Sequence, residues 1–77
     1  MKIEIFGTGC AKCKALEKRV REVVEEMKRN DIEIVKIEDI GEIINRGVIA
    51  TPALAIDGKI KVAGRIPSKE EIKEMIG

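Results

Sequence analysis

Two cysteines, Cys10 and Cys13, stand where a short apolar segment gives way to a long amphipathic one, and this placement limits the possible folds most. Residues 3–6 have the β-branched and aromatic side chains typical of a strand, and Gly7-Thr8-Gly9 then breaks it. Through residues 10–29, apolar side chains recur at three- and four-residue steps, which predicts an amphipathic helix. These side chains are Cys13, Leu16, Val20, Val23 and Met27. The C-x-x-C pair is therefore predicted at a strand-to-helix junction.

The middle of the chain predicts a second strand and a short helix. Residues 32–37 are rich in isoleucine and valine, and a helical crossover from the first strand would make this strand parallel to it. A short helix is expected next, because Asp39 and Glu42 have the spacing of a capping box and Gly47 can end a helix. The side chains expected to form its helical face are Ile40, Ile43 and Ile44.

The last third predicts a hairpin followed by a helix. Asp57-Gly58 separates two strand-like runs, residues 53–56 and 59–62, and this dipeptide is favoured in two-residue turns whose residues both need positive φ. Pro67-Ser68 and Glu71 mark the start of a final helix. The side chains expected to face inward from it are Ile72, Met75 and Ile76. The predicted order of elements is βαβαββα.

The length and composition describe one globular domain. A chain of 77 residues leaves no room for a second domain, so residues 1–77 are expected to form a single α/β unit. The hydrophobic fraction of 44% rests on aliphatic side chains, because Phe6 is the one aromatic residue. Abundant lysine, glutamate and isoleucine resemble the composition of proteins from hyperthermophiles.

The charges exclude some partners. The 15 basic and 14 acidic side chains nearly cancel to a net charge of +1, with no block of one sign. This pattern does not predict the basic patch with which proteins bind nucleic acid or an anionic membrane. No apolar run reaches the length of a signal segment or a membrane span. A cytoplasmic protein without a nucleic-acid or membrane partner is therefore expected.

The two cysteines differ in their expected surroundings. Cys10 begins the predicted helix, where unpaired N–H groups and the helix dipole stabilise an anion, so its thiol should ionise more easily and act as the nucleophile. Cys13 lies on the buried stripe, which favours a resolving thiol that attacks a mixed disulfide from beneath. Lys12 and Lys14 bring positive charge that would favour the thiolate further, or they are simply solvated.

Two other uses of the cysteines stay open. The pair can be a static bridge, because cytosolic disulfides are ordinary in hyperthermophiles. It can also carry a soft metal such as Cu(I), as in small heavy-metal-associated domains, although those domains run βαββαβ and commonly have methionine where this chain has Thr8. A closed zinc site needs four ligands, and the chain offers two cysteines and no histidine. No metal and no cofactor are expected for the redox interpretation.

A second motif joins the cysteines in a family resemblance. Thr51-Pro52 lies just before the first hairpin strand, where a proline does not remove a central sheet hydrogen bond. Four segments together resemble the small thioredoxin-like, or glutaredoxin-like, redox-active disulfide proteins of archaea and bacteria. They are Cys10-Ala11-Lys12-Cys13, Ala50-Thr51-Pro52-Ala53-Leu54, Asp57-Gly58-Lys59 and Gly64-Arg65-Ile66-Pro67-Ser68. The resemblance spans nearly the whole chain.

This resemblance implies a compact thioredoxin-like α/β fold, with a four-stranded mixed sheet and three helices that cover both of its faces. It implies a thiol-disulfide oxidoreductase in which Cys10 attacks and Cys13 resolves. Pro52 would be a cis-proline packed against the disulfide, and Thr51 would offer backbone hydrogen bonds to an extended substrate. The implied partners are a disulfide-containing protein or small-molecule substrate and a thioredoxin-reductase-type electron donor. The chain is expected to act as a monomer.

Overall fold

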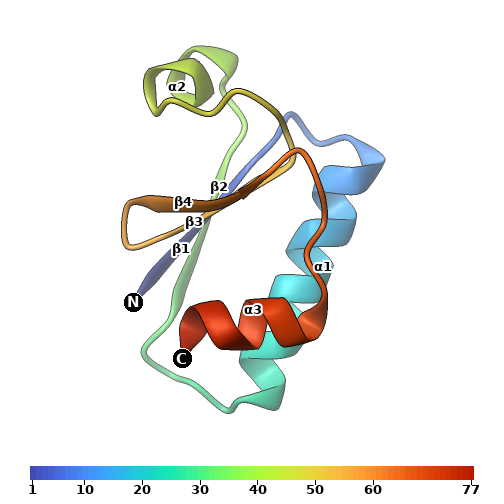
Figure 1. Cartoon of the computed structure of the whole chain (residues 1–77), viewed down its shortest axis with the longest axis vertical. Helices are drawn as coiled ribbons and strands as arrows, with labels where there is room; N and C mark the ends of the chain where they lie inside the picture. Colours follow the sequence, from blue (N-terminus) through green and yellow to red (C-terminus); the bar gives the residue numbers. More distant parts are fainter.

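The computed structural model describes residues 1–77 and contains seven elements in the predicted order βαβαββα. They are β1 (Lys2–Phe6), α1 (Ala11–Glu26), β2 (Glu33–Ile37), α2 (Ile40–Asn45), β3 (Ala53–Ile56), β4 (Lys59–Ala63) and α3 (Lys69–Ile76). The four strands form one mixed sheet in the order β2-β1-β3-β4. Figure 1 shows α1 and α3 together on one side of this sheet and α2 on the other. The expected architecture is therefore confirmed.

The central position of β1 determines where the cysteines lie. β1 pairs with β2 in parallel and with β3 in antiparallel fashion, and α1 makes the crossover that a parallel pair requires. The carboxyl ends of β1 and β2 and the start of α1 therefore meet at one end of the sheet (Figure 1). The order of elements, with α2 after β2 and α3 last, is not the βαββαβ order of heavy-metal-associated domains.

The hairpin of β3 and β4 follows the sequence prediction. Its turn residues Asp57 and Gly58 both have positive φ, 50° and 87°. The pairing of the two strands is antiparallel, with a register shift between Leu54 and Ala55 that the sequence did not reveal. A bulge of this kind increases the local twist of a strand pair without changing the order of the strands.

The sheet separates two groups of buried side chains, because alternate residues of a strand point to opposite faces. The larger group, between the sheet and the helices α1 and α3, consists of Ile3, Ile5, Leu16, Val20, Val23, Leu54, Ile56, Val62, Ile72 and Ile76. The smaller group, on the α2 side, consists of Phe6, Ile43, Val48, Ala53 and Ala55. None of the three helices has the length and apolar character needed to cross a membrane.

The predicted helical face of α2 is only partly buried. Ile43 is buried, but Ile40 and Ile44 are 62% and 65% exposed. Residues four apart lie on the same side of a helix, and here that side faces solvent. Apolar spacing predicts a helical face but does not say whether another element packs on it.

Two methionines are less buried than their predicted inward positions imply. Met27 and Met75 are only half-buried beside the larger group.

The start of α3 gives a testable prediction. The Ser68 hydroxyl accepts a hydrogen bond from the Glu71 N–H at 3.2 Å, and the Glu71 carboxylate accepts one from the Ser68 N–H at 3.0 Å. We expect Ser68→Ala to lower the free energy of unfolding by about 1 kcal/mol, measured by urea denaturation, because this N-cap is lost. Ser68→Asp, which can also cap the helix, should retain most of the stability. An equal loss in both variants would contradict the assignment.

Candidate active site

Cys10 and Cys13 lie one turn apart at the start of α1. Cys10 is the N-cap residue of the helix and is exposed, whereas Cys13 is 6% exposed. Both are free thiols, and their Sγ atoms lie 2.6 Å apart. The backbone N–H of Cys13 also donates to the Cys10 Sγ, at 3.4 Å. The two predicted catalytic residues are thus in contact, one open to solvent and the other buried.

The two thiols differ in acidity. The hydrogen bond from the Cys13 thiol lowers the pKa of Cys10 below its ordinary value of 9.0, and the backbone N–H groups of Cys13 and Lys12 add to this effect. Burial raises the pKa of Cys13, and its hydrogen bond to Cys10 raises this pKa further. The thiolate therefore forms first on Cys10, while Cys13 keeps its proton as the hydrogen-bond donor.

Gly7 lets the Cys13 sulfur approach the end of β1. A Cβ atom added at Gly7 would overlap the Cys13 Sγ and would lie 2.9 Å from the Cys13 Cβ. The Gly7 N–H donates to the Ile37 carbonyl at 3.0 Å, so the pairing of β1 with β2 continues past the strand. Sequence reasoning treated Gly7 only as a strand breaker and missed this steric role. The available signal was the glycine three residues before Cys10.

The structure places Thr51 and Pro52 at the same end of the sheet. The peptide bond between them is cis, as the family resemblance implied, and Pro52 is buried while Thr51 is exposed. The Pro52 carbonyl accepts a hydrogen bond from the Gly64 N–H at 2.9 Å, which joins the start of β3 to the end of β4. The next residue, Ala53, pairs with Phe6 at the end of β1. Thr51 and Pro52 therefore lie next to the segment that leads to the cysteines.

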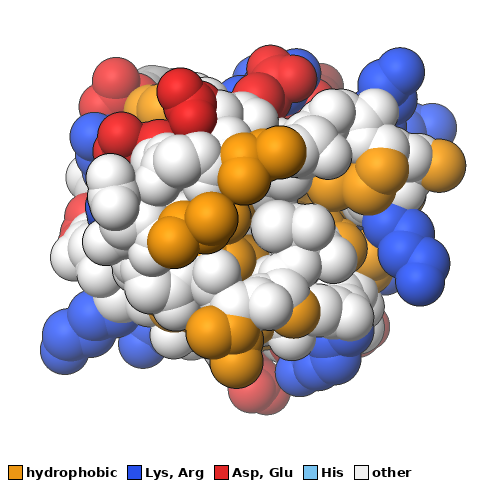
Figure 2. All heavy atoms as spheres, turned by 90° about the horizontal axis from the view of Figure 1, so that it is seen from above, with side chains coloured by type: hydrophobic (Ala, Val, Ile, Leu, Met, Phe, Trp, Pro, Cys, Tyr) orange, Lys and Arg blue, Asp and Glu red, His pale blue; other side chains and the backbone are white.

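Apolar side chains are exposed at this end of the molecule. Figure 2 looks down on it and shows hydrophobic side chains across the face, with most charged side chains around the rim. Ile40 and Ile44 of α2 are exposed, and Ile49, in the loop before Thr51, is 94% exposed. Grouped exposed apolar side chains are typical of surfaces that bind other proteins.

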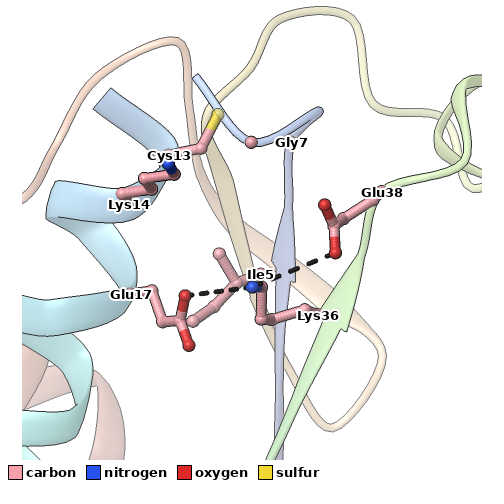
Figure 3. Close-up of a pocket in the computed structure, with 8 residues that line it drawn as sticks. Ile5, Gly7, Cys13, Lys14, Glu17, Lys36 and Glu38 are labelled. Atoms are coloured by element: carbon pink, nitrogen blue, oxygen red, sulfur yellow. Dashed lines mark ion pairs between the residues drawn. The ribbon is translucent and has the colours of Figure 1, made fainter. Parts of the chain in front are cut away.

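A pocket opens beside the buried thiol. Its volume is about 70 Å³, and Cys13 lines it together with charged side chains from α1 and from β2 and its end (Figure 3). The Lys36 Nζ lies 3.3 Å from the Glu17 Oε1 and 3.9 Å from the Glu38 Oε1. No local pattern in the sequence indicates this group as a whole, because its members come from separate segments. A lysine within the otherwise apolar end of strand β2 was the signal that could have identified it.

Comparison with known proteins gives agreement over almost the full length. A family model described as the thioredoxin domain matches residues 1–77. A protein named thioredoxin from Methanothermobacter thermautotrophicus is 50% identical over 76 residues, which cover 99% of this chain and 97% of that protein. A thioredoxin from Methanocaldococcus jannaschii is 50% identical over 72 residues, 94% of this chain and 81% of that protein. The range that the family model matches thus spans both cysteines and the Thr51-Pro52 segment.

The unequal thiols predict a titration in two steps. We expect the ultraviolet absorbance of thiolate to rise first for Cys10, below pH 9.0, and then for Cys13, above it. Cys13→Ala should move the pKa of Cys10 upward, because the side-chain donor is lost. Lys12→Met is the control and should move it less, because its backbone N–H remains. A Cys10 pKa that does not change in Cys13→Ala would contradict the role of the sulfur contact.

Proposed function

Because the chain belongs to the thioredoxin family and is a thiol-disulfide oxidoreductase, we propose that its two cysteines have fixed and different roles. Cys10 is the nucleophile and Cys13 is the resolving thiol. One observation carries this assignment: an exposed thiol with a lowered pKa lies 2.6 Å from a buried thiol with a raised pKa. A lowered pKa makes the attacking thiolate more abundant at any given pH, and burial keeps the second thiol from reacting first.

The exchange consists of two displacements. The Cys10 thiolate attacks one sulfur of a substrate disulfide, the substrate bond breaks, and one substrate thiolate leaves from the mixed disulfide. Cys13 then loses its proton and attacks the Cys10 Sγ. This step breaks the mixed disulfide, releases the second substrate thiolate and forms the Cys10–Cys13 disulfide. Two electrons pass from the cysteine pair to the substrate.

The pocket beside Cys13 supports the second displacement. The Cys13 thiol must give up its proton before it attacks, and burial makes that loss unfavourable. A space of about 70 Å³ that Cys13 itself lines is large enough for water, because a cavity of roughly 15 Å³ by this measure already holds one molecule. Water there would carry the proton past Lys36 and the two carboxylates to solvent. The same path in reverse serves the reduction of the disulfide.

The remaining assignments extend the family role to this chain. We assign Thr51 and Pro52 to the binding of an extended substrate and Lys12 to tuning of the Cys10 thiolate. The substrate is a disulfide-containing protein or small molecule, and a thioredoxin-reductase-type donor restores the dithiol. The working unit is a monomer formed by residues 1–77 as one domain, and its compartment is the cytoplasm. The matches to thioredoxins over nearly the full chain support the assignment of a disulfide substrate and a reductase-type donor.

Replacing each cysteine by serine tests the two roles. Cys10→Ser should abolish the reduction of a protein disulfide, because no thiolate is left at the exposed position. Cys13→Ser should react once and then remain attached to its substrate as a mixed disulfide, because nothing resolves it. Mass spectrometry of the products under non-reducing conditions detects the adduct. If both variants behave alike, the assignment of nucleophile and resolving thiol is wrong.

A further inference from the structure

The sheet buries one charged side chain, Glu4 of β1, which is 3% exposed. Its carboxylate accepts two hydrogen bonds from Arg46, at 2.6 Å from Nη1 and 2.5 Å from Nη2. The Arg46 guanidinium also lies 5.4 Å from the ring centre of Phe6, within the range of a cation–π contact. Arg46 lowers the pKa of the Glu4 carboxyl, so the pair is charged at neutral pH. A buried carboxylate is costly unless it is paired in this way.

The ion pair lies at the start of a loop that the active site uses. Arg46 is the C-cap of α2, and residues 47–52, which we call the substrate loop, run from there to β3. At the other end of the loop, Ala53 pairs with Phe6. Glu4 and Phe6 are two residues apart, so they lie on the same face of β1. One strand therefore anchors both ends of the substrate loop and then continues toward Cys10.

Few other contacts hold the start of the substrate loop. The Gly47 and Val48 N–H groups donate to carbonyls of α2 at 3.0 and 3.2 Å, and Val48 packs in the small buried group with Ile43. The following residue, Ile49, is 94% exposed. Arg46 is the side chain that joins α2 and this part of the loop to β1 by hydrogen bonds.

We propose that the Glu4–Arg46 ion pair holds the substrate loop in position beside Cys10. The efficient reduction of polypeptide disulfides depends on this position. The inference rests on the proposed function, in which Thr51 and Pro52 of that loop bind an extended substrate. A polypeptide must reach the loop and Cys10 together, whereas a small disulfide needs only Cys10. Neither Glu4 nor Arg46 touches a cysteine, so both are positioning residues.

Arg46→Met tests the proposal, because it keeps an unbranched apolar side chain beside Phe6 and removes both hydrogen bonds. We expect kcat/KM for the reduction of insulin to fall about tenfold, mainly through KM, since a misplacement of about 1 Å can cost on the order of 100-fold. The rate with a small aromatic disulfide should change less than about twofold. The pKa of Cys10 should not change. Amide exchange at Gly47 and Val48 should become faster.

Two further variants separate positioning from stability. Arg29→Met breaks another bidentate arginine pair, in which Arg29 binds Asp31 at 2.7 and 2.8 Å beyond the far end of α1, and it should leave both reactions unchanged. The double variant Glu4→Leu with Arg46→Met replaces the buried pair by apolar side chains, which preserves folding in comparable cases. It should show the same selective loss with insulin as Arg46→Met, because the two hydrogen bonds between residues 46 and 4 are still absent.

The outcomes are distinct. A selective loss with insulin in both Arg46 variants supports the proposal. Equal losses with both disulfides, no loss with either, or recovery of the insulin rate in the double variant would overturn it, because the pair would then be only a structural element. If the unaltered protein reduces neither disulfide, the proposed function itself is wrong, and that result is separate from any effect of Arg46.

Discussion

The hydrogen bond between the Cys13 thiol and the Cys10 sulfur is the interaction on which the chemistry depends. Together with the burial of Cys13, it makes two identical side chains unequal, because a Cys10 thiolate can only accept a hydrogen bond, which lowers the pKa of Cys10 and raises that of Cys13. This contact requires the close approach of Cys13 to the end of β1, which in turn requires the absence of a Cβ atom at Gly7. The acidity of the thiols is therefore a consequence of how β1 and α1 pack.

The strand β1 serves as the common frame of the active site. On one face, Ile3 and Ile5 pack in the group that holds α1 and thus Cys13. On the other face, Glu4 binds Arg46, and Phe6 belongs to the smaller buried group. These four residues of β1 thereby connect both cysteines and the Thr51-Pro52 segment to one strand. A chain of 77 residues can support a precise site because its parts share one central strand.

Local sequence signals predicted most of the fold. Features that depend on contacts between residues far apart in the chain could not be predicted. The C-x-x-C junction, the Asp57-Gly58 turn and the capping box of Ser68 each depend on residues close together in the chain, and the structure confirms their placement. The Glu4–Arg46 pair joins residues 42 positions apart, so no local pattern reveals it. The pocket lined by Cys13 and Lys36 likewise requires three segments to meet. The exposed side of α2 could not be predicted, since apolar spacing alone does not identify a packing partner.

The central claim is that Cys10 and Cys13 form a redox couple that cycles rather than a fixed bridge. The reduction potential of this couple tests it most directly. Metal-free protein is equilibrated in graded thiol buffers, alkylated, and analysed by mass for its redox state. The account predicts a potential between about −180 and −280 mV, the range of known exchange proteins. A potential well below about −300 mV would identify a structural disulfide and contradict the account.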